Sequence, residues 1–185
     1  MSILWYLKYS MFSWHSSTFI FFIKFLYFFY GSSLEKAVKN NNFEFVYFCL
    51  LLKEKVIPEY LFVGNTNLKL MAIPSTITSI GIFAFGGCSS LTHILLPSSL
   101  TSIRDLAFFR CTSLIQISIP LSVTSIGDSA FYGCSSLKQI SIPSLVTSIG
   151  KYTFYECSSL MQMSIPATLD IKNLLIPSTM KVVKY

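Results

Sequence analysis

The amino-acid sequence predicts a solenoid of stacked coils, because residues 65–185 repeat one pattern at every twenty-third position. Proline marks the period at Pro74, Pro97, Pro120, Pro143 and Pro166, and leucine marks it at Leu68, Leu91, Leu114, Leu137 and Leu160. Two further columns keep the same step: Phe85, Phe108, Phe131 and Phe154, and Cys88, Cys111, Cys134 and Cys157. A coil this short cannot bury its own apolar face, so we expect the repeats to fold only by stacking.

Residues 1–31 form an apolar leader whose role the sequence leaves open. Eleven of the twelve residues in 19–30 are apolar. This run is too short for a membrane-spanning helix, which needs about 20 residues. Lys8 before the run and the small residues 31–33 after it favour a secretory signal or a membrane anchor. The Phe, Ile, Tyr and Lys bias equally fits a misassigned start, and a packed helix is the third interpretation.

Residues 32–64 are expected to form a helical cap over the first coil. Ser32 and Glu35 match a capping box, and the run KNNN interrupts the apolar stripe, which predicts two short helices. The stripe consists of Leu34, Val38, Phe45, Phe48 and Leu52. The stretch AVKNNNFEFVYFCLL also resembles one ankyrin-type helical pair. Residues 55–68 are open to interpretation as a decayed repeat, since their Ile-Pro precedes Pro74 by sixteen positions instead of one full repeat.

Within one repeat, residues 137–143 are predicted to form a strand. Leu137, Ile140 and Ile142 are apolar, and they alternate with the polar Gln139 and Ser141, as in a half-buried strand. Proline follows, and because it has no N–H to donate to a sheet, it suits the end of a strand.

The other half of the coil is predicted from residues 145–160. Val146 and Ile149 point to a second short extended piece, and Gly150 is expected to permit a turn. Arg104 replaces this glycine in one repeat, so a positive φ is not required there. Alanine, phenylalanine and cysteine then cross the far side of the coil.

These positions together resemble the BspA-like leucine-rich repeat, which occurs in bacterial surface proteins. The resemblance is complete over residues 65–166, where Ile-Pro, Thr-Ser-Ile-Gly, Ala-Phe, Cys and Ser-Ser-Leu recur in order. It implies a right-handed leucine-rich-repeat solenoid with a parallel β-sheet on one face. It also implies a non-enzymatic role in cell adhesion or protein recognition at a cell surface.

The last repeat is predicted to be shortened. After Pro166, the next strand-like segment is residues 171–177, which ends only eleven positions later, so twelve positions of the coil are missing. Terminal repeats often diverge to shield the core, so this coil is either a cap or part of a longer array. The sequence slightly favours the longer array.

Charge and composition argue against nucleic-acid binding, catalysis and metal binding. The net charge of +6 is divided into +2 for residues 1–64 and +4 for residues 65–185, and the basic residues of the repeats occupy four different positions. His93 stands where other repeats carry glutamine, and His15 lies in the leader, so no catalytic set forms. Cysteines one full repeat apart do not match zinc-ligand spacing, and we expect them to be reduced, buried thiols. No cofactor is expected.

The exposed face of the predicted sheet is the candidate partner-binding site. Side chains pointing out of the strands form two neutral columns, flanked by Thr92, Ile115, Lys138 and Met161. The expected protein-binding residues are His93, Gln116, Ser118, Gln139, Ser141, Gln162 and Ser164, with Leu95 beginning the serine column. An exposed sheet also needs polar residues simply for solubility, so the columns alone do not establish binding.

Two functions follow from this surface. A cell-surface or secreted adhesion module requires an export signal, and membrane association through residues 19–30 then remains open. The alternative is an intracellular interaction scaffold with a spurious leader and an ankyrin-like N-terminal segment. We slightly favour the surface location, and fractionation of cells with a C-terminal tag separates the two.

Overall fold

A computed structural model describes residues 34–43, 46–47, 50–51, 54–171, 174–176 and 180–185. The leader lies outside the described residues, as do Ser32, Phe45, Phe48, Cys49 and Leu52 of the predicted helical cap. Within the described residues, no helix is long and apolar enough to cross a membrane.

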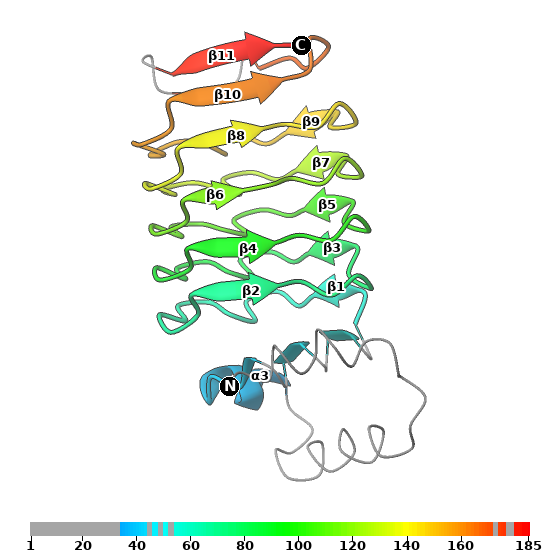
Figure 1. Ribbon diagram of the computed structural model, residues 1–185, viewed down its shortest axis with the longest axis vertical. Coiled ribbons are helices and arrows are strands. Elements are labelled where there is room, and N and C mark those ends of the chain that lie inside the picture. Colours follow the sequence, from blue (N-terminus) through cyan, green and yellow to red (C-terminus); the bar gives the residue numbers. More distant parts are fainter. Residues whose placement is uncertain (1–33, 44–45, 48–49, 52–53, 172–173, 177–179) are drawn as a thin grey trace, which may run out of the picture.

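The chain forms a solenoid whose strands lie in two columns along the stack (Figure 1). One column is a single five-stranded sheet of β1 (Val56–Ile57), β3 (Ser79–Ile80), β5 (Ser102–Ile103), β7 (Ser125–Ile126) and β9 (Ser148–Ile149). The other column holds β2 (Leu70–Ala72), β4 (His93–Leu95) and β6 (Gln116–Ile117) in one sheet. A second sheet in this column contains β8 (Gln139–Ser141), β10 (Gln162–Ile165) and β11 (Lys181–Lys184).

All strand pairs are parallel, and most keep the register of the sequence repeat. Ser79 pairs with Ser102, and Gln139 pairs with Gln162, in each case one full repeat further along the chain. Each residue therefore lies beside its equivalent in the next coil, which is why one sequence pattern serves every rung.

The last rung differs from the prediction. Gln162 pairs with Lys181, which stands four positions earlier than a full repeat would place it, so this coil is only slightly shortened. The predicted strand in residues 171–177 is wrong: Ile171 and residues 174–176 are not in a strand, and β11 takes that place.

The first coil begins upstream of the predicted boundary at residue 65. Residues 56–64 form β1 and turns, which supports the interpretation of residues 55–68 as a repeat over their assignment to the helical cap. Val56 pairs with Ser79, and the Phe62 ring stacks on Phe85 with centroids 4.8 Å apart. The Ile-Pro of this segment therefore aligns with Ile80 and Gly81, which explains why it stands closer to Pro74 than one full repeat.

The helical segment breaks where the sequence predicts. The helix α3 (Leu34–Lys39) ends before Asn41, whose φ is 54°, and helical residues resume at Phe43. Ala37, Val38, Val46 and Leu50 are buried in the same apolar core as the first coil. Figure 1 shows α3 at the N-terminal end of the stack.

Asn65 links this helix to the solenoid. It occupies the repeat position at which the later coils have cysteine. Its Nδ2 donates to the Val38 carbonyl at 3.5 Å, and its Oδ1 accepts the N–H groups of Asn67 and Leu68, both at 2.9 Å. A polar side chain thus replaces the thiol where the coil meets a helix rather than another coil.

Stacked phenylalanines fill the centre of the solenoid. Phe85, Phe108 and Phe131 are 0% exposed, and Phe154 is 1% exposed. Adjacent rings in this column are nearly parallel, with centroids 5.2, 5.3 and 5.8 Å apart. Burial of an aromatic side chain removes about 150–250 Å² from water, so this column contributes much of the hydrophobic stabilisation.

The cysteines do more than fill space beside the rings. The Cys88 thiol donates to the Phe62 carbonyl at 3.1 Å, and the remaining thiols bond the preceding coil at 3.1–3.2 Å. All four are free thiols, and burial raises the pKa of Cys88 and Cys157 to about 12. The column therefore links successive coils through weak hydrogen bonds to backbone carbonyls, each of which also accepts a backbone N–H within its own coil.

The turn glycines have a different role from the predicted one. Positive φ occurs two residues later, at Phe83 and its equivalents Tyr60, Leu106, Ser129 and Tyr152. At Gly81, an added Cβ would lie 2.5 Å from the Ile57 carbonyl oxygen. Glycine is favoured there because adjacent backbones approach closely, not because φ is positive. Arg104 at the equivalent position also has no positive φ.

Candidate functional site

The two predicted polar columns lie side by side on the face of β4, β6, β8 and β10. His93 pairs with Gln116, and Gln139 pairs with Gln162, so amide side chains repeat along the stack. The strands bury the residues between these columns, including Ile117, Ile140 and Met163. The side chains of the columns themselves are exposed, except for Ser164, which is half-buried.

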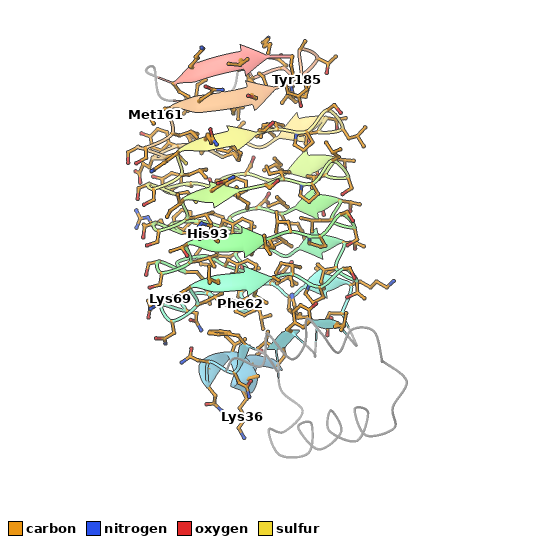
Figure 2. The ribbon with its side chains drawn as sticks, in the orientation of Figure 1. Lys36, Phe62, Lys69, His93, Met161 and Tyr185 are labelled. Carbon is orange, nitrogen blue, oxygen red and sulfur yellow. The ribbon has the colours of Figure 1, made fainter. Side chains whose placement is uncertain are left out.

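A hollow of about 380 Å³ opens on this face across three coils. Six of the seven predicted binding residues line it, namely Gln116, Ser118, Gln139, Ser141, Gln162 and Ser164. His93 is the exception: it is the first residue of β4, one strand beyond its pairing partner Gln116, and Figure 2 labels it. The other lining residues are Ile117, Ile119, Leu121, Ile140, Pro143 and Tyr185.

The hollow lies where the sheet is interrupted. β6 and β8 are neighbours along the stack, yet they belong to different hydrogen-bonded sheets. At the start of the gap, Lys138 N–H donates to the Ile115 carbonyl at 3.3 Å. The continuous ladder is then lost between Gln116 and Gln139, so the floor of the hollow spans the separation between the two sheets. No signal in the sequence marks this break, because both strands match the repeat.

Tyr185 forms one wall of the hollow. Its N–H donates to the Ile165 carbonyl at 3.0 Å, and its own carbonyl accepts the Ala167 N–H at 2.9 Å. This pairing places Tyr185 beside Pro166, where the preceding coils carry proline. Its hydroxyl reaches back two coils to donate to the Ile142 carbonyl at 2.7 Å. In Figure 2, Tyr185 lies near the C-terminal end of the solenoid.

The chemistry of the hollow suits recognition by hydrogen bonding. Glutamine amides both donate and accept, serine hydroxyls do the same, and the lining residues include no Asp, Glu, Lys, Arg or His. Leu121 is 75% exposed and adds apolar surface to the rim. Among the described residues, no group of three or more His, Cys, Asp or Glu side chains is arranged to hold a metal ion.

This fold defines a class of protein, the leucine-rich-repeat solenoid, in which successive coils present parallel columns of side chains. The family model described as "BspA type Leucine rich repeat region" matches residues 55–181 in six copies. The chain therefore belongs to the BspA-type leucine-rich-repeat family. The match begins at Lys55, which agrees with the upstream start of the first coil. No curated protein gives a significant match.

Solved structures of leucine-rich-repeat proteins resemble the chain. The Treponema pallidum leucine-rich-repeat protein is 35% identical with a TM-score of 0.60, and the match covers 61% of this chain and 53% of that one. A leucine-rich-repeat protein from Bacteroides ovatus is 27% identical with a TM-score of 0.55, covering 71% and 43%. The pneumococcal vaccine antigen PcpA is also 27% identical, with a TM-score of 0.63, covering 71% and 34%. The chain thus spans about half or less of each relative.

Proposed function

We propose that the protein is a non-enzymatic recognition module that binds a protein partner through the hollow of its strand face. The observation that carries this proposal is the convergence of six neutral polar side chains from three coils around one hollow. Solenoids commonly present such extended surfaces to partners, and repeats of this family generally mediate protein interactions.

The contacts favour recognition over catalysis. The glutamines and serines supply hydrogen-bond donors and acceptors on successive coils: β8 and β10 are paired at about 4.8 Å, and β6 lies on the other side of the interruption between the two sheets. Tyr185 and Leu121 add apolar contact at two positions on the rim. Tyrosine is enriched in protein interfaces because one ring offers a large contact area and a hydroxyl.

A location at the cell surface is part of this proposal. One structural relative is described as a vaccine antigen, which supports an exposed location for that protein. The alternative is an intracellular scaffold that uses the same face. A C-terminal tag followed by fractionation distinguishes them: surface or secreted protein supports adhesion, and cytosolic protein supports the scaffold.

Paired charge substitutions test the binding face. Gln116→Glu with Gln139→Glu places two unpaired charges in the hollow, and we expect the partner to be lost because these charges would be desolvated on binding. The matched control is Thr124→Glu with Thr147→Glu, which places the same charges one coil apart beside β7 and β9. Both threonines are exposed there.

The measurement is affinity purification with the wild-type protein and both double variants, each checked for folding by circular dichroism. A protein retained by wild type and the threonine pair but lost by the glutamine pair supports the proposed face. Loss with the threonine pair and retention by the glutamine pair would place binding elsewhere.

A further inference from the structure

A second surface, away from the hollow, is a line of exposed and half-buried aromatic rings that lies outside the buried phenylalanine column. We call it the aromatic ridge, and it consists of Tyr60, Phe83, Phe109, Tyr132, Tyr155 and Tyr152. Successive ring centroids along the ridge lie 5.9, 5.5, 5.1, 5.5 and 6.1 Å apart. Its outer tyrosines are well exposed: Tyr60 is 55%, Tyr152 is 47% and Tyr155 is 42% accessible to solvent.

The ridge is continuous because rings from two repeat positions share it. Phe83 and Phe109 occupy different positions of the repeat, yet their ring centroids lie only 5.5 Å apart. The Phe83 ring leans over Gly86, where an added Cβ would meet the ring at 2.6 Å. Gly86 occupies the position that gives Phe109 and Tyr132 in the next coils, so the Phe83 ring fills the place of a missing side chain.

Two opposite charges border the ridge at equivalent positions, two coils apart. Arg110 lies over the Phe109 ring, with its guanidinium carbon 5.4 Å from the ring centroid. Glu156 accepts a hydrogen bond of 2.7 Å from the Tyr132 hydroxyl through Oε1. Gly133 occupies the same position in the coil between them. Both charged side chains are exposed.

The positive Arg110 precedes the negative Glu156 along the stack, so a second copy in the opposite direction would present a negative charge to Arg110 and a positive charge to Glu156. We propose that a second copy of this chain docks on the aromatic ridge in antiparallel orientation, about a two-fold axis through the coil of Tyr132 and Gly133. Under this symmetry Arg110 faces Glu156 of the second copy, and Glu156 faces its Arg110. The same contact forms twice, as an isologous interface requires.

Spacing and composition favour this occupant. Two copies carry ridges of identical spacing, so around the axis Tyr132 lies opposite Tyr132 and Phe109 lies opposite Tyr155 of the second copy. Tyrosine, phenylalanine and arginine are enriched at the centres of protein interfaces, where they contribute most of the binding energy. A partner with one uniform charge would pair with Arg110 or with Glu156 and leave the other unpaired.

Sedimentation velocity of the 185-residue chain tests the interface. We expect the wild type to form dimers, and we expect Arg110→Glu or Glu156→Arg to weaken dimerisation by about 100-fold, because each variant brings like charges together. An equimolar mixture of these two variants should recover a dimer, since each copy then supplies the charge that the other needs. The double variant with both substitutions should also dimerise with itself.

The control is Lys138→Glu, which changes an exposed charge next to β8, outside the ridge, and should leave dimerisation unchanged. Association through the apolar leader would persist in both single variants, so it would be distinguished from the ridge. A monomeric wild type, undiminished association in the single variants, or failure of the mixture to recover a dimer would each overturn the proposal. None of these outcomes bears on the strand-face hollow, which is a separate surface.

Discussion

The phenylalanine and cysteine columns inside the solenoid differ from the polar columns on its strand face in how closely they follow the repeat. Inside, the same residue recurs in four successive coils, and its side chain is at most 1% exposed. On the face, histidine gives way to glutamine, leucine gives way to serine, and the sheet itself is interrupted. The interior must pack each coil on the next, whereas the face is free to vary, so the two regions should respond differently to substitution.

Phe131→Ala is expected to have the largest effect on stability. Phe131 lies between Phe108 and Phe154 with nearly parallel rings on both sides, so truncation leaves a cavity that the adjacent coils cannot fill. We expect the free energy of unfolding in urea to fall by about 3–5 kcal/mol. An unchanged unfolding midpoint would contradict the role assigned to the column.

Alkaline pH is expected to destabilise the fold through the buried thiols. Because burial raises the pKa of Cys88 and Cys157 to about 12, the unfolded chain releases its thiol protons first as the pH rises. Their stabilising contribution is complete below the unfolded thiol pKa of about 8.5 and is lost between there and about pH 12. Each buried thiol should cost about 1.4 kcal/mol per pH unit in that range.

Cys134→Ala isolates the thiol contribution from other groups that titrate at high pH. Burial raises the pKa of Cys134 well above its ordinary value, so its removal should make the alkaline loss of stability less steep by one thiol's share. Urea unfolding at several alkaline pH values measures this slope. Identical slopes for the variant and the wild type would contradict it.

Asn65→Ala tests the junction where the repeat meets the helix. The substitution removes two acceptor contacts at 2.9 Å and a weaker donor contact to Val38, so we expect a loss of about 1 kcal/mol. Asn65→Cys is the informative companion, because it restores the repeat residue but loses the amide contacts. If the cysteine variant were more stable than the wild type, the helix would not need the asparagine.

The smallest effect on stability is expected on the strand face. Gln116→Glu with Gln139→Glu changes exposed side chains, so each substitution should alter the free energy of unfolding by less than about 0.5 kcal/mol. Urea unfolding beside Phe131→Ala makes the contrast direct. A loss comparable to that of Phe131→Ala would show that the face supports the fold.

The sequence predicted what the period of the repeat determines, and it missed what departs from that period. The strands follow from the alternation around residues such as Ile140, and the break in the helical segment follows from the polar run that contains Asn41. In both places the local sequence pattern agrees with the observed structure. The final strand was not predicted because its coil is shorter than the others. The start of the first coil was misplaced because Pro58 aligns with a glycine instead of with the repeat proline. The contact between Phe83 and Phe109 crosses repeat positions, so no column in the sequence displays it.

The candidate site was predictable only in part. Alternation along the strands identified the exposed glutamines and serines, because the period of two fixes which side chains leave the sheet. Tyr185 does not match any residue type of the repeat, so the sequence could not show that it forms a wall of the hollow. The separation of β6 from β8 depends on backbone geometry, and the two strand sequences match the repeat equally well.

Hydrogen–deuterium exchange, measured with and without a purified protein partner, tests the central claim most directly. Binding through the hollow should slow exchange in residues 116–118, 139–141 and 162–164, and in the chain around Tyr185 that forms its wall. Residues 102–103, 125–126 and 148–149 of the other sheet should exchange as before. Slowed exchange confined to that other sheet, with the hollow unaffected, would contradict recognition through the strand face.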